Sequence, residues 1–291
     1  MNILVTGANG QLGTELRLKS AESRHRFVFT DVTEVPGVDT VNLDITNIDA
    51  IRLVADSERI DLIINCAAYT AVEKAEDDRK MADLLNHKAP GYLADVAKER
   101  GATLIHISTD YVFPGNGCVP VQESAAVSPR SVYGHTKLDG EKAVCNSGCN
   151  YIILRTAWLY SPFGNNFVKT MRKLTADNDS IQVVFDQVGT PTYAADLASA
   201  ILHIVDNGLL GHKGIYHFSD EGAVSWYDFA QHIRRLCGNV CDIRPCLSAA
   251  FPTKAERPHY SVLDKTLFKE TFGFRPPYWL DSLEDCIKRL D

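Results

Sequence analysis

Two short motifs bring together residue types suited to the reduction of a carbonyl group. Tyr133 and Lys137 are four residues apart, so on a helix their side chains project from one face and the ammonium can stabilise the phenolate. The motif Gly7-Ala-Asn-Gly-Gln-Leu-Gly13 follows an apolar run over residues 2–6. A loop of this kind opens a helix whose backbone N–H groups and dipole receive a pyrophosphate. A site for a hydride donor together with a proton donor predicts a carbonyl reductase.

Asp31 supports the dinucleotide prediction. It ends a second strand-like segment, residues 26–31, and follows Gly13 at close to the roughly 20-residue spacing expected of a carboxylate that bonds the adenosine ribose hydroxyls. Val32 and Thr33 come next, so no basic residue adjoins the carboxylate. Because a 2′-phosphate would face this negative charge, the sequence favours NADH over NADPH on physical grounds.

A segment with two hydroxyls, Ser108-Thr109-Asp110-Tyr111, follows the apolar run at residues 103–107. If that run is a strand, the segment falls at its carboxyl end, where open α/β sheets bind their ligands. Thr109 can then share the substrate carbonyl oxygen with the phenol of Tyr133. The alternative is that these residues only cap the next helix.

The composition is that of an ordinary globular protein. Of the 291 residues, 45% are hydrophobic and 23% are charged, and no apolar run approaches the roughly 20 residues that cross a bilayer. The net charge of −7 argues against nucleic acid as the main partner. Because no signal-peptide pattern precedes the first strand, we expect a cytoplasmic protein with no membrane contact. The eight cysteines contain no C-x₂-C pair, which predicts reduced thiols rather than a zinc site.

Short apolar runs alternate with longer helical stretches in the first half of the chain. The alternation predicts βαβ units and therefore a doubly wound, Rossmann-like α/β fold with a parallel sheet. Residues 70–100 predict a long helix interrupted near Pro90. The runs centre on residues 4–5, 27–29, 62–66, 104–107 and 152–154.

After Trp158 the alternation weakens, which marks a second region over the strand ends. We expect a dinucleotide-binding domain over residues 1–157, rejoined by parts of 190–220. A smaller substrate-binding region then takes residues 158–189 and 221–291.

Several longer motifs carry a resemblance to one family. With the glycine loop and the Tyr/Lys pair, they make the chain resemble the extended short-chain dehydrogenase/reductases over nearly its whole length, and within them the dTDP-4-dehydrorhamnose reductases. The resemblance implies NAD(P)H-dependent reduction of the C4 ketone of dTDP-4-dehydro-β-L-rhamnose, the last step to dTDP-L-rhamnose. The motifs are Asn65-Cys-Ala-Ala-Tyr-Thr-Ala-Val-Glu-Lys-Ala-Glu76, Ser108-Thr-Asp-Tyr-Val-Phe-Pro-Gly115, Arg155-Thr-Ala-Trp158, Gly164-Asn-Asn-Phe167, Asp186-Gln-Val-Gly-Thr-Pro-Thr192 and Arg257-Pro258.

The resemblance also implies a role for each matching residue. The catalytic set is Thr109, Tyr133 and Lys137, with Tyr133 as the proton donor. The cofactor set is Gly7, Asn9, Gly10, Gln11, Leu12, Gly13, Asp31, Asp44, Ile45, Ala67, Ala68, Tyr69, Tyr133 and Lys137. The substrate set is Thr70, Val72, Thr109, Asp110, Tyr111 and Trp158, with Asn165, Asn166 and Arg257 at the nucleotide end. Core packing is the alternative for Trp158, and a solvated surface is the alternative for the last three.

Departures from the family pattern restrict these implications. The related sugar dehydratases carry an acid directly after the Thr–Asp pair, and Tyr111 stands there, which disfavours dehydration. Some family members bind magnesium through acidic residues that include the position of Ala195. Magnesium is therefore doubtful, and we predict no metal site. The choice between NADH and NADPH, the choice between dTDP and UDP, and the oligomeric state, a homodimer being one option, stay open.

Two other functions compete with the reductase. A nucleotide-sugar epimerase of the same superfamily would oxidise and re-reduce its sugar while retaining the cofactor. A regulatory subunit of methionine adenosyltransferase would be non-catalytic. Such subunits tend to lose catalytic residues, whereas this chain keeps Thr109, Tyr133 and Lys137.

Overall fold

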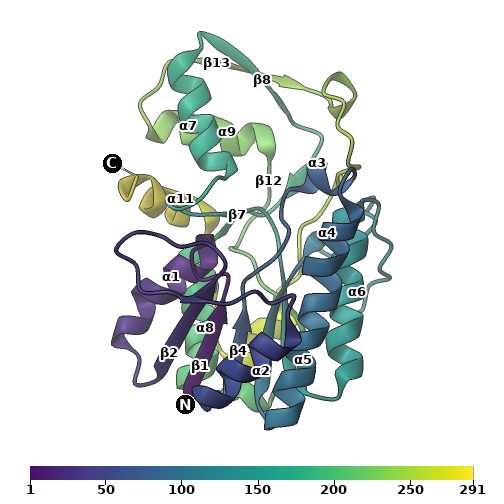
Figure 1. The fold of residues 1–291 in the computed structure, drawn as a ribbon. Helices are drawn as coiled ribbons and strands as arrows, with labels where there is room; N and C mark the ends of the chain where they lie inside the picture. Colours follow the sequence, from purple (N-terminus) through teal and green to yellow (C-terminus); the bar gives the residue numbers. More distant parts are fainter. Residues whose placement is uncertain (291) are drawn as a thin grey trace.

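A seven-stranded parallel sheet forms the centre of the lower part of the molecule in Figure 1. The computed structural model describes residues 1–290 and orders the strands β11-β6-β5-β4-β1-β2-β3. The middle strands are apolar on both faces, as expected where helices cover both sides, and this confirms the doubly wound fold. The strands are β1 (Asn2–Thr6), β2 (Arg26–Asp31), β3 (Val41–Asn42), β4 (Leu62–Asn65), β5 (Thr103–Thr109), β6 (Asn150–Thr156) and β11 (Gly214–His217).

Helices cover the two faces of the sheet. The apolar sides of α1 (Gln11–Lys19) and α8 (Ala194–Asp206) pack on one face. The other face is covered by α2 (Ile48–Ser57), α5 (Ala89–Arg100) and α6 (Val132–Ser147). Near the end of the chain, α10 (Thr266–Phe272) returns to the first face and buries Phe268 and Phe272 there. The sequence analysis had placed these residues in the substrate-binding region. It could not reveal their packing on the sheet, because their partners lie far away in the sequence.

The helix predicted over residues 70–100 is interrupted earlier than expected. α3 (Val72–Ala75) ends, and α4 (Arg79–Asp83) then continues through a π-helical segment, η2 (Leu84–Lys88), directly into α5. Pro90 has no N–H for the carbonyl of Asn86, and the wider π turn lets the helix pass it. Gly140 of α6 packs against this carbonyl, because a Cβ there would lie 2.1 Å from the Asn86 oxygen. The irregularity near Pro90 is thus a change of helical pitch, and the break lies before α4.

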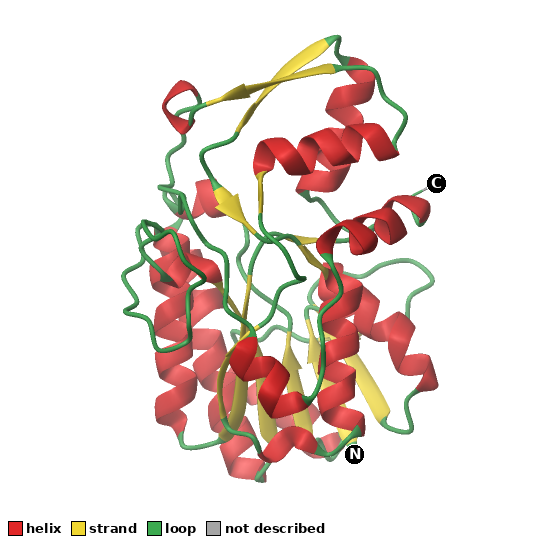
Figure 2. Ribbon diagram, turned by 180° about the vertical axis from the view of Figure 1, so that it is seen from behind, coloured by secondary structure: helices red, strands yellow, loops and turns green. Residues whose placement is uncertain are grey.

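A smaller region lies over the sheet in Figures 1 and 2 and has its own apolar core. Its helices are α7 (Phe167–Asp177), α9 (Trp226–Leu236) and α11 (Trp279–Lys288). α9 begins with a capping box between Ser225 and Asp228, which satisfies N–H groups of its first turn. The strand pairs are β7 (Leu159–Tyr160) with β10 (Thr192–Tyr193), β8 (Ser180–Val184) with β13 (Asp242–Cys246), and β9 (Val188–Gly189) with β12 (Val224–Ser225).

Four short 3₁₀ turns complete the elements of residues 1–290, namely η1 (Ser20–Glu22), η3 (Asp110–Val112), η4 (Leu209–Gly211) and η5 (Ser248–Ala250). In the same part of the chain, no helix is both long enough and apolar enough to cross a bilayer. All eight cysteines are free thiols.

Candidate active site

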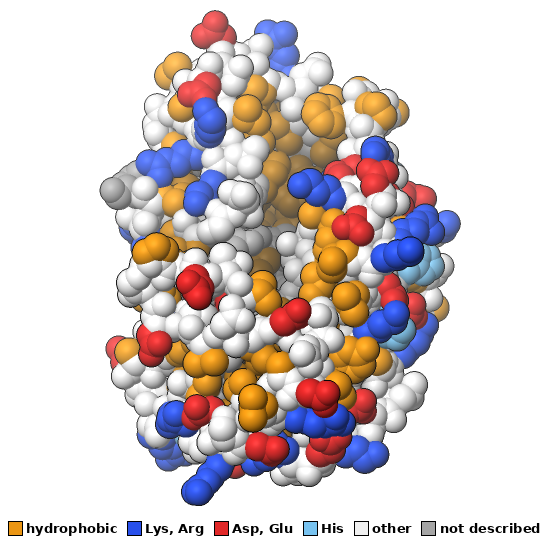
Figure 3. Space-filling model, in the orientation of Figure 1, with side chains coloured by type: hydrophobic (Ala, Val, Ile, Leu, Met, Phe, Trp, Pro, Cys, Tyr) orange, Lys and Arg blue, Asp and Glu red, His pale blue; other side chains and the backbone are white. Residues whose placement is uncertain are grey.

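A cavity of about 720 Å³ lies where the carboxyl ends of the central strands meet the smaller region. Figure 3 shows a hollow with hydrophobic side chains on its walls between the two parts of the molecule. Open α/β sheets bind ligands at this edge. The predicted residues on its wall are Gly7, Gly10, Gln11, Leu12, Asp31, Asp44, Ile45, Ala67, Ala68, Thr70, Val72, Thr109, Asp110, Tyr111, Tyr133, Lys137, Trp158 and Asn165. Ser108, in the segment that the sequence analysis placed at this edge, also lines the cavity. The sequence analysis missed Val32, Leu43, Cys66, Leu85, Ile107, Thr156, Ala157, Leu159 and Gly164.

The glycine loop between β1 and α1 is shaped by close backbone approaches. Gly7 has φ +63°, and a Cβ there would lie 2.6 Å from the backbone nitrogen of Ala67. A Cβ on Gly13 would lie 2.4 Å from the Gly7 carbonyl oxygen. Gly13 therefore packs the loop against its own helix, while Gly7 and Gly10 face the cavity. The open N-terminus of α1 fits the diphosphate of a dinucleotide.

The Asp31 carboxylate supports the glycine loop as well as the cavity wall. Its Oδ2 accepts the N–H of Asn9 at 3.0 Å, and its Oδ1 accepts the N–H of Thr33 at 2.9 Å. The Asn9 side chain in turn donates to the Thr33 carbonyl at 2.6 Å. Since a carboxylate oxygen can accept more than one hydrogen bond, Asp31 keeps acceptor capacity for ribose hydroxyls.

Thr109, Tyr133 and Lys137 meet on one wall of the cavity. Thr109 ends β5, and Tyr133 is in the first turn of α6, whose N-cap Ser131 accepts the N–H of Gly134. Lys137 lies one turn further along α6 and is 2% exposed. A hydroxyl, a phenol and an ammonium thus face the same space, as the sequence analysis predicted.

The electrostatics of this group differ from the prediction. Burial raises the pKa of Tyr133, and the Thr109 hydroxyl only partly opposes that rise. Burial lowers the pKa of Lys137 to about 8, against the effect of the Glu141 carboxylate. The Lys137 ammonium donates to the carbonyl oxygen of Ile107 at 2.5 Å instead of to the phenol. Coupling the ammonium to the phenol therefore needs a group that contacts both.

Asp110 offers a polar atom to the cavity. Its side chain is buried, and within residues 1–290 its Oδ2 has no hydrogen-bond partner. Burial raises the pKa of this carboxyl to about 6, although the hydroxyls of Ser261 and Thr109 lower it. An unpaired buried carboxyl oxygen is costly, so Oδ2 is suited to a hydroxyl of a bound ligand.

A buried ion pair lies behind the catalytic wall. Arg155 of β6 donates to both oxygens of Glu141 on α6, at 2.9 and 2.7 Å, and both side chains are almost fully buried. Ser108 of β5 also donates to Glu141. The pair fixes α6, which carries Tyr133 and Lys137, to two strands of the sheet. The sequence shows Glu141 four residues after Lys137. It does not show that Glu141 pairs with Arg155.

Trp158 has a backbone conformation that costs energy. Its φ is +50°, which disfavours a side chain and is found mostly where the surroundings enforce it. Its indole stacks on Trp226 with ring centroids 3.5 Å apart and planes at 8°. A Cβ on Gly189 would lie 2.8 Å from the same indole. Trp226 thus supports a residue of the cavity wall, and no local sequence signal indicated this contact.

Comparison with known proteins shows the family to which the chain is related. The family model described as RmlD substrate binding domain matches residues 1–291. The dTDP-4-dehydrorhamnose reductase of Aggregatibacter actinomycetemcomitans is 39% identical over 97% of this chain and 97% of its own length. The chain belongs to the dTDP-4-dehydrorhamnose reductase family.

One further relative and one solved structure are also similar to the chain over nearly its whole length. A probable dTDP-4,6-dihydroxy-2-methyloxan-3-one 4-ketoreductase of Streptomyces antibioticus is 41% identical, over 99% of this chain and 95% of that protein. The crystal structure of dTDP-4-dehydrorhamnose reductase from Bacillus anthracis in complex with NADP superposes with a TM-score of 0.89 at 36% identity, covering 99% of each chain.

Five residues implied by the family resemblance lie off the cavity wall: Asn9, Gly13, Tyr69, Asn166 and Arg257. Asn9 and Gly13 shape the glycine loop from behind. Tyr69 packs against the same small apolar cluster as Tyr133, and its backbone N–H and carbonyl are both bonded by the side chain of Asn86, at 2.8 and 3.1 Å. Asn86 thus holds the loop that carries Thr70, a role that the sequence analysis missed.

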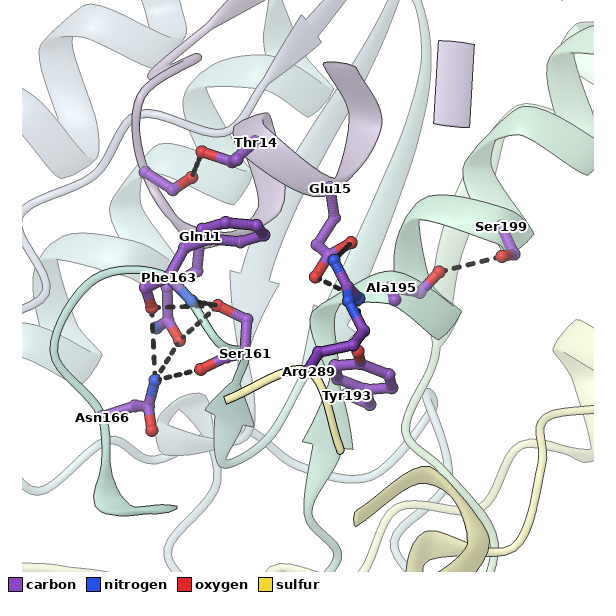
Figure 4. A network of polar contacts seen from close by, with 11 residues as sticks. Gln11, Thr14, Glu15, Ser161, Phe163, Asn166, Tyr193, Ala195, Ser199 and Arg289 are labelled. Atoms are coloured by element: carbon purple, nitrogen blue, oxygen red, sulfur yellow. Dashed lines mark hydrogen bonds and ion pairs between the residues drawn. The ribbon is translucent and has the colours of Figure 1, made fainter. Parts of the chain in front are cut away.

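Asn166 links the two regions of this family member. It caps α7, and its Nδ2 donates to Oε1 of Gln11 in the glycine loop at 3.0 Å (Figure 4). Ser161 donates to the same oxygen at 3.2 Å. The Gln11 side chain is therefore held by the smaller region, and cofactor loop and substrate region are joined beside the cavity.

The polar residues near Ala195, where the family resemblance implies a magnesium ligand, do not fit a metal ion (Figure 4). Glu15 is 1% exposed and pairs with Arg289, whose Nη1 lies 2.8 Å from Oε1 and whose Nη2 donates to Oε2 at 3.1 Å. Arg289 also donates to Tyr193 (Figure 4). Ala195 has no ligating oxygen in its side chain. Within residues 1–290, no group of three or more His, Cys, Asp or Glu side chains is placed to hold a metal.

Proposed function

We propose that the protein catalyses the NAD(P)H-dependent reduction of the C4 ketone of dTDP-4-dehydro-β-L-rhamnose to dTDP-L-rhamnose. The observation that carries the proposal is the meeting of Thr109, Tyr133 and Lys137 with the glycine loop in one cavity, in a chain of this reductase family. Bound NAD(P)H supplies the hydride that reaches the ketone carbon.

The chain's own residues would handle the ketone oxygen and the proton. Thr109 and Tyr133 hold the oxygen, and Tyr133 gives it the proton that converts alkoxide to alcohol. The high pKa of the buried phenol keeps the proton in place before reaction. Lys137, one turn along α6 from Tyr133, would hold the ribose of the cofactor and would assist the proton transfer from Tyr133.

The sugar would lie between two walls of the cavity. Asp110 offers its unpaired Oδ2 to a sugar hydroxyl, while Thr70, Val72, Tyr111 and Trp158 enclose the ring. The nucleotide extends toward Asn165 and Arg257, where the guanidinium suits a diphosphate.

Cofactor choice is a finer proposal. Asp31 lines the cavity, and the residues that follow it in the chain, Val32 and Thr33, are not basic, which favours NADH. The Bacillus anthracis relative was crystallised with NADP, so we propose that the enzyme accepts NADPH as well.

A second candidate substrate comes from the Streptomyces antibioticus relative, whose name describes a 4-ketoreductase acting on a different dTDP-linked sugar. The chemistry at C4 is the same, and only the contacts with the rest of the ring differ. Epimerase and regulatory functions lose support because the chain matches reductases along its whole length and keeps all three catalytic side chains.

A coupled assay tests the proposal. The ketosugar is made enzymatically from dTDP-glucose, and the loss of nicotinamide absorbance is followed with NADH and with NADPH. We expect stoichiometric consumption with at least one cofactor. No consumption with either would sink the reductase proposal, and a preference for the second candidate's ketosugar would move the substrate to it.

Three organisational proposals complete this picture. We propose the domain division given by the sequence, with α10 moved to the dinucleotide-binding domain because Phe268 packs there. The free cysteines support a reducing compartment such as the cytoplasm. A homodimer stays a prediction, which light scattering after size-exclusion chromatography checks.

A further inference from the structure

Glu73 is a charged residue next to the cavity wall in the sequence, and the reaction gives it no role. It lies in α3, directly after Val72 and three residues after Thr70, both of which line the cavity. Its Oε1 accepts from Nη2 of Arg257 at 2.6 Å. Its Oε2 accepts the backbone N–H of Lys254 at 2.9 Å. Both carboxylate oxygens are thus bonded to the segment of residues 254–261, called the strap below.

The strap reaches the catalytic wall through Arg257. Nη1 of Arg257 donates to the phenol oxygen of Tyr111 at 3.2 Å. The Tyr111 ring meets the Tyr133 ring edge to face, with centroids 5.5 Å apart and planes at 80°. A continuous set of contacts therefore runs from Glu73 through Arg257 and Tyr111 to the proton donor.

The rest of the strap is fixed independently of Glu73. Pro258 packs so closely on Gly115 that a Cβ on Gly115 would lie 2.4 Å away. The N–H of Tyr260 bonds the Gly115 carbonyl at 2.9 Å. Lys254 also pairs with Asp77 in solvent. Removing the contact between Glu73 and Arg257 should therefore change the orientation of the Arg257 guanidinium without unfolding the strap.

The guanidinium keeps donors for a ligand. Arginine has five N–H groups, and Glu73 and Tyr111 take one from each terminal nitrogen. The side chain is 27% exposed, so it is partly desolvated yet reachable. A guanidinium held from two sides loses little rotamer freedom when it binds a diphosphate, and this preorganisation favours affinity.

We propose that Glu73 is a positioning residue for the substrate diphosphate: it holds the Arg257 guanidinium at the rim of the cavity, beside Tyr111. This inference rests on the proposed function and deepens it. It predicts that Glu73 sets affinity for dTDP-linked ligands without contacting the reacting atoms.

The test compares Glu73→Gln with Asp77→Asn. Asp77 is the matched control because it pairs with the same strap through Lys254 from an exposed position. For Glu73→Gln we expect KM for the ketosugar and the Kd of dTDP to rise about tenfold, the scale of one lost charge-assisted hydrogen bond. KM for the nicotinamide cofactor, and the Kd of thymidine, which lacks the diphosphate, should stay within twofold. Asp77→Asn should change none of these.

Three outcomes would overturn the inference: unchanged dTDP affinity in Glu73→Gln, an equal loss for thymidine, or an equal loss in Asp77→Asn, which would indicate general strap anchoring. Titration with dTDP needs no turnover. A wild type that binds dTDP but reduces no ketosugar would therefore defeat the proposed function, while the same titration still decides the role of Glu73.

Discussion

Breaking the buried Glu141–Arg155 pair should destabilise the protein strongly. Arg155→Met leaves the Glu141 carboxylate almost fully buried, with a hydrogen bond from Ser108 and the more distant charge of Lys137 but without its bidentate partner. Removing one partner of a buried pair typically costs roughly 3–5 kcal/mol. Large domains lose about 2–4 °C in Tm for each kcal/mol. We therefore expect Tm to fall by about 6–20 °C, measured by differential scanning calorimetry.

Two companion variants make this prediction specific. Arg155→Met combined with Glu141→Leu removes both charges and leaves mainly the Ser108 hydroxyl unsatisfied, about 1–3 kcal/mol, so it should recover much of the lost Tm. Glu99→Gln breaks an equally bidentate pair with Arg52 at 2.9 and 2.8 Å, but at the solvent-exposed surface. We expect almost no change in Tm there, because solvent screens exposed pairs. A double variant no more stable than Arg155→Met, or an equal loss in Glu99→Gln, would refute the reasoning from burial.

Three further predictions concern two catalytic residues and one cofactor-binding residue. Tyr133→Phe should lower kcat by about 10² to 10⁴, the range of a lost general acid, with cofactor affinity by titration little changed; near-normal turnover would reassign the donor. The pKa of Lys137 of about 8, against 10.5 unfolded, predicts that kcat falls as pH rises through about 8. Between about pH 8 and pH 10.5, Lys137 is protonated in the unfolded chain but not in the folded protein, so the free energy of unfolding should rise with pH. A free energy of unfolding that falls with pH in this range, as kcat does, would contradict this assignment. Asp31→Ser should move the kcat/KM ratio toward NADPH at fixed ionic strength, and an unmoved ratio would mean that Asp31 serves only Asn9 and Thr33.

The parts of the fold that repeat along the chain could be predicted from the sequence. Strand-and-helix alternation gave the parallel sheet, and strand ends gave Thr109, Asp110 and Tyr111 on the cavity wall. These signals are local, because a strand end marks the ligand edge wherever the strand lies in the sheet. The family motifs placed most of the remaining residues of the wall.

Features made by distant residues could not be predicted. β3 and β11 are too short to show a period of their own, and α10 chooses the main core through two phenylalanines. The stacking of Trp226 on Trp158 and the pairing of Arg289 with Glu15 join residues far apart in the chain. The direction of the Tyr133 pKa depends on burial, which spacing along one helix does not reveal.

Transfer of an isotopic label tests the central claim most directly. NADPH carrying deuterium on the transferable position of its nicotinamide C4 is incubated with the enzyme and the dTDP-4-ketosugar, and the product is examined by mass spectrometry and NMR. The reductase account predicts one deuterium at sugar C4 for each cofactor oxidised, and loss of this transfer in Tyr133→Phe. An isomerised sugar without deuterium and without net cofactor oxidation would contradict it and indicate an epimerase.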